Sequence, residues 1–534
     1  MKRRIQNSRV AATVLLAAPL TGAFAGDQEK SQDASELRNI VVIISDDHAL
    51  HVTGTYGNSI IRTPHIDRFA DESVTFTEAY CNSPICSASR QSLLTGKLPH
   101  ATGVNLLFTP FQDEGNVTIA EHLKENGYQT GLFGKTHFNN WVWHSLYTNG
   151  LPQHGFDTLI SRKDYRTYFK AQEMPSLPKD MEFYDFQKSK AIVTESMNWR
   201  NLPHPVYDEY SEGTFYANQA IEFMKENRDQ PFIAWVAFKE PHHPFYFPIE
   251  YAGKYDPADM PLPEGSPEDD RWVPEKYRNF SEEERRGVIA SYYTSTEYMD
   301  KNVGRVLAAL DDLKLTENTL VIYLSDNGYL LNDHKRFEKH TMWQEAVHQP
   351  MILRPGAPLS RPRRSAAMIE FIDLVPTLLE LTGVQPLDEV QGKSFAHLLK
   401  NRNAEHREAV FSEYLEDNLA MIKTAEWKYV FTTGRRDLGI NYQTGYGPSG
   451  IIHRLYNLKK DPGEQTDVSK KPKNQKTLEE MQLMMLQRFV ETHPDAVRCP
   501  QNLSLEGKLV WFCEPRDVGS DQSREDIPLR VFSK

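Results

Sequence analysis

The sequence predicts an α/β protein with a large mixed, mostly parallel sheet flanked by helices, followed by a smaller C-terminal α+β unit on an antiparallel sheet. Three runs of β-branched and other apolar residues, at 39–45, 231–238 and 319–325, are typical of strands buried on both faces. Helical segments separate these runs, as in proteins that cover a parallel sheet with helices. After about residue 405 apolar and polar residues alternate, which favours antiparallel strands with one solvated face.

The first 25 residues have the pattern of a secretory signal peptide. Four basic residues precede an apolar run, Val10–Leu20, and small residues at Ala23 and Ala25 have the spacing that a signal peptidase requires. This run is shorter than the roughly 20 residues that span a bilayer, and no other stretch is long enough. We expect cleavage after Ala25, a periplasmic or secreted location and no transmembrane segment. The expected parts are the signal peptide 1–25, a main α/β domain 26–404, and a C-terminal subdomain 405–534 with an irregular tail.

Charge and cysteine content limit the partners and the compartment. Loss of the signal peptide removes four basic and no acidic residues, so the formal net charge changes from −12 to −16. Nucleic acids bind basic surfaces, so we expect no nucleic-acid partner, and an anionic substrate needs a local basic pocket. Cys499 and Cys513 are close in sequence and are able to form a disulfide in an oxidising compartment; a bridge between Cys81 and Cys86 is another alternative.

The first predicted strand ends in two adjacent carboxylates, Asp46 and Asp47. The carboxyl ends of strands in open α/β sheets border the ligand crevice. Two carboxylates there repel each other unless a cation lies between them. The pair therefore indicates a metal site, or else only a turn with a helix cap.

Cys86 is expected to begin a short helix. Pro84 disfavours helix before it, Ser87 is able to cap, and Gly96 supplies the stop. A helix N-terminus favours an anionic ligand, and Arg90 points the same way from the next turn. On its own, however, a cysteine at a helix start is more often a buried structural residue.

Lys135 and His137 follow the next predicted strand. A capping box at Thr118–Glu121 opens a helix that runs to Gly127, and the strand covers 128–133. We expect both side chains to emerge at the same sheet edge as the two aspartates. A solvated loop is the alternative for such residues.

Two long connections are expected over this edge of the sheet. Residues 138–212 are rich in aromatic and basic residues, and we interpret them as loops whose aromatics, including Trp141 and Trp143, contact substrate. The acidic and proline-rich segment 251–284 is expected to form a rim or a lid.

Between these connections a helix at about 214–226 leads to the strand 231–238. That strand is followed by Pro241-His242-His243-Pro244, where the prolines fix a turn that holds an imidazole. A long helix is expected at about 284–313, with Tyr292 among its core contacts.

The strand 319–325 repeats the design of the first and ends in Asp326 and Asn327. Together with Asp46 and Asp47 these residues offer four hard oxygen ligands, which suit Ca²⁺ or Mg²⁺ and not zinc. Lys339 follows in a loop.

The remaining elements are assigned from pattern alone. The main domain is completed by a strand at 350–353 and a helix at 373–381; the subdomain contains strands at 421–424, 427–431 and 454–458 and a helix at 475–491. The last forty residues are expected to be irregular.

These residues together strongly resemble the formylglycine-dependent type I sulfatases of the alkaline phosphatase superfamily, over most of the mature chain. Cys86-Ser87-Ala88-Ser89-Arg90 with the following Leu-Leu-Thr-Gly is similar to the modification motif of the family, and 127–137 is similar to its second motif. The other motifs follow in the expected order: Asp46-Asp47, Pro241-His242, Asp326-Asn327-Gly328 and Lys339. The resemblance implies an alkaline-phosphatase-like fold whose main domain is catalytic.

The resemblance also implies the site. Its catalytic residues are Cys86, Arg90, Lys135, His137, His242 and Lys339; its Ca²⁺ ligands are Asp46, Asp47, the modified Cys86, Asp326 and Asn327. Cys86 is implied to be oxidised to formylglycine (3-oxoalanine), whose hydrated form attacks sulfur. Lys135, His242 and Lys339 bind the substrate, and both lysines neutralise the sulfate oxygens. Arg90 holds the second hydroxyl, His242 protonates the leaving oxygen, and His137 takes a proton as sulfate is released. His243 is able to replace His242, although Pro241 favours His242.

The implied function is hydrolysis of sulfate esters or N-sulfates in a sulfated sugar or polysaccharide fragment, with release of inorganic sulfate. The implied partner is a sulfatase-maturing enzyme that acts on the Cys86 motif. Ala88 stands where proline is often found, which resembles bacterial members matured by a radical-SAM enzyme. Two alternatives remain: a phosphate or phosphonate monoesterase of the same superfamily, and a non-catalytic protein that binds sulfated glycans.

Overall fold

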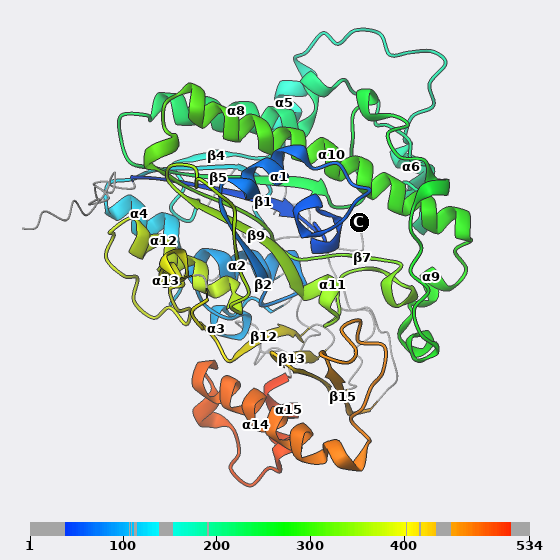
Figure 1. Cartoon of the computed structure of the whole chain (residues 1–534). Coiled ribbons are helices and arrows are strands. Elements are labelled where there is room, and N and C mark those ends of the chain that lie inside the picture. Colours follow the sequence, from blue (N-terminus) through cyan, green and yellow to red (C-terminus); the bar gives the residue numbers. More distant parts are fainter. Residues whose placement is uncertain are drawn as a thin grey trace, which may run out of the picture. The chain divides into compact units, whose positions relative to one another are not determined.

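A computed structural model of the chain is shown in Figure 1. It describes residues 38–513 except 138–152, 434–449 and the shorter stretches 106, 108, 110, 112–114, 190–191, 402 and 416–417. The predicted signal peptide, Trp141 and Trp143 lie outside the described residues, as does everything after Cys513.

Within the described residues the main sheet has nine strands and is mixed and mostly parallel, which confirms the predicted fold class. In spatial order the strands are β10 (Arg363–Ser365), β2 (Val74–Tyr80), β9 (His348–Pro355), β6 (Thr319–Ser325), β1 (Asn39–Asp46), β5 (Phe232–Pro241), β3 (Gln129–Gly134) and β4 (Thr158–Ile160), and β11 (Ile369–Glu370) also pairs with β2. Strand β9 runs antiparallel to both of its neighbours, and the other pairings are parallel.

Strand β1 is apolar on both faces because both faces are covered. It pairs in parallel with β5 and β6. Ile40, Val42 and Ile44 belong to the hydrophobic cluster on one face, and Val41 and Ile43 belong to the cluster on the other. This alternation explains why a continuous apolar run predicts a central strand.

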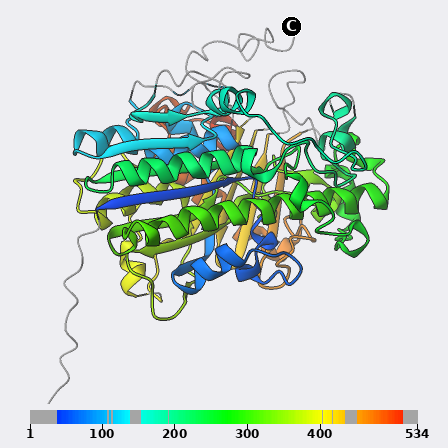
Figure 2. The ribbon, with the colours of Figure 1, turned by 90° about the horizontal axis from the view of Figure 1, so that it is seen from above.

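Helices cover both faces (Figure 1). Helices α1 (Pro64–Asp71), α8 (Glu212–Glu226) and α10 (Glu282–Asp312) contribute to the cluster that contains Val41 and Ile43. Figure 2 shows α8 and α10 lying side by side over the sheet. Helices α2 (Cys86–Thr95), α4 (Ile119–Glu125) and α12 (Leu374–Leu381) pack on the opposite face.

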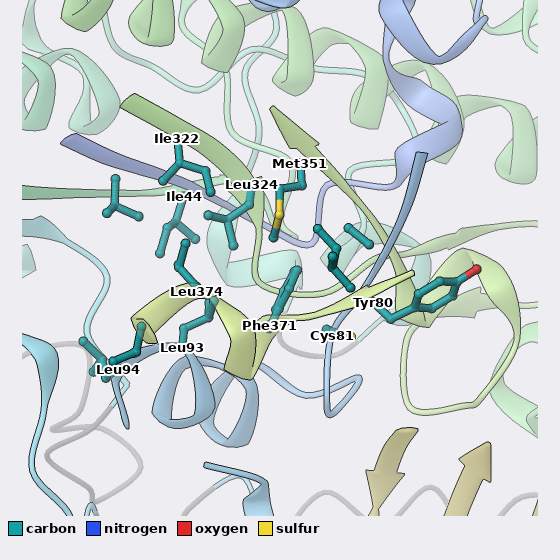
Figure 3. Packing of buried hydrophobic residues seen from close by; sticks show 14 of the residues in the cluster. Ile44, Tyr80, Cys81, Leu93, Leu94, Ile322, Leu324, Met351, Phe371 and Leu374 are labelled. Carbon is teal, nitrogen blue, oxygen red and sulfur yellow. The ribbon is translucent and has the colours of Figure 1, made fainter. Parts of the chain in front are cut away.

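The packing of α2 fixes the position of Cys86. Leu93 and Leu94 face the sheet near Ile44, and Leu374 of α12 lies beside them (Figure 3). Each fully buried leucine contributes about 1.5–3 kcal/mol of hydrophobic stabilisation. This packing gives α2 a single position on the sheet and thereby fixes the position of its first residue, Cys86.

A second, antiparallel sheet follows, as predicted, but among the described residues it has four strands where three were expected, and the additional strand is the first in the sequence. Its strands are β12 (Ala409–Tyr414), β13 (Leu419–Thr424), β14 (Trp427–Thr432) and β15 (Ile452–Asn457). Helices α14 (Gln475–Thr492) and α15 (Leu505–Cys513) share a hydrophobic cluster with it. The domain boundary at residue 405 stays a prediction.

The other described helices and strands are short. They are α3 (Pro99–Thr102), α5 (Arg162–Lys170), α6 (Phe186–Ser189), α7 (Val193–Ser196), α9 (Glu275–Arg278), α11 (Gln344–Val347), α13 (Ala396–Lys400), β7 (Leu330–Leu331) and β8 (Phe337–Glu338). None of the helices in the described part of the chain combines the length and apolar character needed to cross a membrane.

Several local predictions differ from the structure. Ser87 lies inside α2, whose N-cap is Ile85, because the helix already begins at Cys86. The segment 138–212 contains more than loops, since a capping box at Ser161 opens α5. The final forty residues include α15, whose apolar residues pack against α14.

Cys499 and Cys513 are buried in the cluster that α14 and α15 share. No disulfide is recorded between these two described residues, and the pairing suggested by their spacing stays a prediction. A buried thiol packs there as a small apolar side chain.

We predict that Gly134, the last residue of β3, does not tolerate a side chain. Its φ is +113°, and a Cβ atom would lie 2.1 Å from the carbonyl oxygen of Ala237 on β5. Gly134→Ala must displace one of two paired strands, which costs about 1–3 kcal/mol beyond the roughly 1–2 kcal/mol of the left-handed conformation. Urea denaturation measures this loss in the free energy of unfolding.

Gly127→Ala is the matched control, since Gly127 also has a positive φ (+85°) but no atom lies within 4 Å of the added Cβ. The free energy of unfolding of this variant should fall only by the cost of the left-handed conformation, about 1–2 kcal/mol. Equal losses in the two variants would contradict the predicted clash.

Candidate active site

The predicted site residues meet at the carboxyl-end edge of the main sheet. They follow four strands: Asp46 and Asp47 at β1, Asp326 and Asn327 at β6, Lys135 and His137 at β3, and His242 at β5. Cys86 and Arg90 reach this edge from α2, and Lys339 from the loop after β8. Asp46 pairs in register with Pro241, and Ser45 pairs with Ser325. The end of β1 therefore lies between His242 and Asp326, whereas Cys499 and Cys513 lie elsewhere, in the C-terminal cluster.

Three carboxylates are buried together at the centre of this edge. Oxygens of Asp46, Asp47 and Asp326 lie within 4.8 Å of one another, and all three residues are fully buried. Burial and the neighbouring carboxylates raise the pKa of both Asp47 and Asp326. A bound cation would stabilise the ionised form of this cluster.

The unsatisfied atoms of the cluster fit such a cation. Asp46 Oδ1, Asp47 Oδ2 and Asn327 Oδ1 are buried and have no hydrogen-bond partner among the described residues. An unpaired buried polar atom costs about 1–3 kcal/mol. Carboxylate and amide oxygens are the donors that Ca²⁺ and Mg²⁺ prefer. The donor set therefore suits a hard divalent cation better than zinc.

Two buried lysines partly neutralise the carboxylates. Lys135 forms an ion pair with Asp46, and Lys339 forms one with Asp47. The Nζ atom of Lys339 also lies 3.3 Å from the Sγ atom of Cys86. Burial opposes the charge on Lys339, but Asp47 and other nearby acidic groups raise its pKa well above the ordinary value. A fixed positive charge thus lies beside Cys86.

Cys86 is not activated as a thiol. It is the first residue of α2 and is buried. Burial raises the pKa of its thiol even though Lys135 and Lys339 act in the opposite direction. Because the thiolate is the reactive form of cysteine, the side chain is a poor nucleophile at neutral pH.

Arg90 connects three elements of the site. Its Nε atom donates to Asp326 Oδ2 (2.7 Å), and its Nη1 atom donates to the carbonyl oxygen of Lys135 (3.0 Å). Its Nη2 atom is buried and has no hydrogen-bond partner among the described residues. One N–H group of the guanidinium is therefore available to a ligand.

The candidate histidines are held by backbone contacts. Nδ1 of His242 donates to the carbonyl oxygen of His243 (2.6 Å), and its Nε2 lies 3.8 Å from Asp47 Oδ2. His243 stacks on His242 with ring centroids 4.4 Å apart.

His137 is held through its backbone, because its carbonyl oxygen accepts a hydrogen bond from Gln91 Nε2 (2.8 Å). The Nδ1 atom of the His137 ring is buried without a partner among the described residues. Burial, followed by nearby cationic side chains, lowers the pKa of His137 well below its usual range.

Two supporting residues were not assigned to the site from the sequence. The hydroxyl of Tyr292 on α10 donates to the carbonyl oxygen of Asp47 (2.5 Å). Ser89 Oγ donates to the carbonyl oxygen of Asp326 (2.5 Å). A hydrogen bond from Tyr292 could have been anticipated from the sequence, because a tyrosine on the buried face of a helix needs a partner for its hydroxyl. Nothing in the sequence pointed to the role of Ser89 except its place in the Cys86 motif.

Two protein-family models match the chain. The model described as sulfatase matches residues 38–384, a range that contains every catalytic and metal-binding candidate. The model described as N-sulphoglucosamine sulphohydrolase, C-terminal, matches residues 332–491.

Similar proteins match along most of their length. An ulvan-active sulfatase from Formosa agariphila is 29% identical over 478 residues, which are 86% of this chain and 83% of that protein. A phosphonate monoester hydrolase of Agrobacterium radiobacter has a TM-score of 0.71 at 20% identity, covering 88% of this chain and 98% of its own. A protein solved in complex with its substrate D-glucosamine-2-N,6-O-disulfate has a TM-score of 0.65 at 20% identity, covering 86% of this chain and 98% of its own.

The two structural likenesses establish the fold and leave the chemistry open, because their identities are low. The match to the sulfatase model decides membership, since it spans well over half of the chain and includes the buried carboxylates, Cys86 and both lysines. The chain therefore belongs to the sulfatase family and is an enzyme that hydrolyses sulfuric esters.

Proposed function

We propose that this enzyme removes sulfate from the O-sulfate or N-sulfate groups of a sulfated saccharide, with a formylglycine made from Cys86 and a bound Ca²⁺ ion. The observation that carries the proposal is the buried cluster of oxygens beside Cys86 and Lys339 that have no hydrogen-bond partner among the residues the structure describes. A saccharide substrate is supported by the ulvan-active relative and by the similar structure that holds a disulfated glucosamine.

The Ca²⁺ ion would be held by Asp46, Asp47, Asp326 and Asn327, with residue 86 beside it. When bound, it would lower the pKa of a hydroxyl at residue 86 and offset the charge of the sulfate. Ca²⁺ is proposed over Mg²⁺ because Ca²⁺ accepts irregular sets of oxygen ligands, whereas Mg²⁺ demands near-octahedral geometry.

The thiol of Cys86 suits a precursor better than a nucleophile, given its raised pKa. A hydrated formylglycine supplies one hydroxyl for attack and a second that releases sulfate without a separate water. Cys86 is only 2% exposed. We therefore propose that the maturing enzyme, of the radical-SAM type that the Ala88 motif resembles, acts before the chain has folded.

The surrounding side chains bind the sulfate and move protons. The ammonium groups of Lys135 and Lys339 neutralise the sulfate oxygens. Because Nδ1 of His242 donates to a carbonyl, Nε2 is the nitrogen left to face the leaving oxygen. Burial lowers the pKa of the ring in the unliganded site, so His242 delivers a proton from Nε2 once the negative charge of the bound sulfate has favoured the doubly protonated ring. His137, which is neutral, accepts a proton from the hydroxyl that remains at residue 86, and Arg90 orients that hydroxyl.

We place the protein in the periplasm or outside the cell, on the secretory pattern of its first 25 residues. N-terminal sequencing of the exported protein should begin at Gly26. Recovery of an uncleaved chain from the cytoplasm would contradict this location.

Substrate turnover tests the function directly. The mature protein should release sulfate from defined O- or N-sulfated mono- and disaccharides, and its kcat/KM for 4-nitrophenyl sulfate should exceed that for 4-nitrophenyl phosphate, as expected of a member of the sulfatase family. Ion chromatography and absorbance measure the two products. A preference for phosphate or phosphonate monoesters would overturn the proposal in favour of a monoesterase.

Cys86→Ala should abolish turnover while leaving the melting temperature within a few degrees of the unmodified protein, since it removes the precursor but no hydrogen-bonded backbone. Cys81→Ala is the matched control, because Cys81 is equally buried but belongs to the core. It should retain turnover. Mass spectrometry of the residue 86 peptide should show the aldehyde in active protein; an active enzyme with an intact thiol would refute this mechanism.

Ca²⁺ should stabilise the folded enzyme as well as activate it. Binding at a hundred times Kd adds about 2.7 kcal/mol to the free energy of unfolding, which thermal melting detects after removal of metal by a chelator and return of Ca²⁺. Asp47→Asn should lose most of this increase. Asp300→Asn, which alters a buried aspartate on α10 outside the cluster, should keep it. A Ca²⁺ response unchanged in Asp47→Asn would contradict the proposed ligand set.

A further inference from the structure

A cavity of about 210 Å³ lies at the end of β5, on the face of the sheet that α8 and α10 cover. It is lined by residues of α5, the start of α8, Tyr298 of α10, Glu240 of β5 and the segments 204–206 and 246–248. No catalytic or metal-binding candidate lines it. Glu240 is nevertheless only two residues from His242, so the cavity lies close to the candidate active site.

Two buried side chains that line the cavity have polar atoms to which no described residue is hydrogen-bonded. Both ring nitrogens of His204 are without a partner among the described residues, and so is Oε2 of Glu240. The two residues are 4% and 2% exposed. Native proteins rarely leave such atoms unsatisfied, because each costs about 1–3 kcal/mol. Burial lowers the pKa of His204 well below its ordinary value, so the ring is neutral and offers one donor and one acceptor.

The walls of the cavity are largely aromatic. Tyr165, Phe169, Tyr246 and Phe247 line it. The ring of His204 stacks on Tyr246, with centroids 3.4 Å apart, which fixes the direction of its nitrogens. An apolar cavity with a few oriented polar groups is the usual form of a small-molecule site.

The charges of the lining disfavour an anionic ligand. Arg162 is the one lysine or arginine among the lining residues, and its Nε lies 3.5 Å from Glu212 Oε2. Behind the lining, Lys239 Nζ lies 4.3 Å from the ring centroid of Tyr246 and interacts electrostatically with Glu240. The acidic Glu212 and Glu240 thus balance the basic Arg162 and Lys239, and no net positive charge is left for a sulfate or carboxylate group. A ligand with an ammonium group would be repelled by the guanidinium of Arg162. The lining favours an uncharged ligand that both donates and accepts hydrogen bonds.

We propose that this cavity binds an uncharged, hydroxyl-bearing sugar ring: a non-sulfated unit of the saccharide whose sulfated unit lies at residue 86. Its volume corresponds to about seven water molecules at ~30 Å³ each, which is room for a single pyranose ring. Hydroxyl groups supply partners for His204 and Glu240, and the aromatic walls contact the C–H faces of the ring. The saccharide class rests on the proposed function.

Binding without turnover tests this inference. The probes are methyl β-D-glucopyranoside, methyl α-L-rhamnopyranoside and N-acetylglucosamine, none of which carries sulfate, added to the full mature chain and followed by saturation-transfer NMR. At least one should bind, and a crystal structure at high probe concentration should place its ring in the cavity against His204 and Glu240.

His204→Phe keeps the stacked ring but removes both nitrogens, and it should weaken binding about tenfold, the effect of one to two lost hydrogen bonds. Val206→Phe fills the cavity from its lining and should abolish binding. Tyr207→Phe is the control, because Tyr207 is adjacent in sequence but its hydroxyl bonds Ser176 outside the cavity. Thermal melting verifies that each variant is folded.

The inference is overturned if crystals at high probe concentration hold only water in the cavity, if inorganic sulfate occupies it in preference to the pyranosides, or if both cavity variants bind the probes unchanged. Sulfate-ester turnover without pyranoside binding would reject the cavity assignment and leave the proposed function standing. Pyranoside binding in the cavity without any sulfatase turnover would support the assignment and reject the proposed function.

Discussion

The structure depends on the burial of three carboxylates at one edge of the main sheet. Asp46, Asp47 and Asp326 are removed from water and held close enough to repel one another. The chain surrounds them with Lys135, Lys339 and Arg90, each from a different element. Loss of one member of a buried ion pair costs about 3–5 kcal/mol, so these contacts bind β1, β3, β6 and α2 into one rigid unit. Three oxygens still lack hydrogen-bond partners within the described part of the chain, and a cation would complete the arrangement.

The same cluster explains why the surrounding fold is so strongly fixed. A doubly covered parallel sheet brings the ends of β1, β3, β5 and β6 to one edge, and α2 is held by leucines packed on that sheet (Figure 3). Tyr292 of α10 reaches from the opposite helix layer to the backbone of Asp47. Cys86 thereby lies buried beside Lys339, where its raised pKa keeps the thiol protonated at neutral pH. Such a setting is poor for thiol chemistry and well suited to an aldehyde hydrate stabilised by fixed charges.

The sequence predicted the strands and site residues whose signals are local. Continuous apolar runs located β1, β5 and β6, and the paired oxygen-bearing side chains at the ends of β1 and β6 indicated where the carboxylates would gather. Strand β2 was missed although Val74-Thr75-Phe76-Thr77 alternates apolar and polar residues as a half-buried strand does. Its sheet partners, and the partners of its polar groups, lie far along the chain. The role of Tyr292 also depends on a contact 245 residues away. Such long-range pairings leave no trace in local periodicity, and neither does the cavity at His204, whose lining comes from separate segments of the chain.

The most direct test of this account is a crystal structure of the matured enzyme in Ca²⁺, with anomalous scattering recorded for calcium and sulfur. We expect a calcium peak bound by oxygens of Asp46, Asp47, Asp326 and Asn327 at about 2.3–2.6 Å, and a residue 86 that carries oxygen and gives no sulfur peak. A sulfur peak at residue 86 in active crystals, or a carboxylate cluster filled only by the ammonium groups of Lys135 and Lys339 at saturating Ca²⁺, would contradict it.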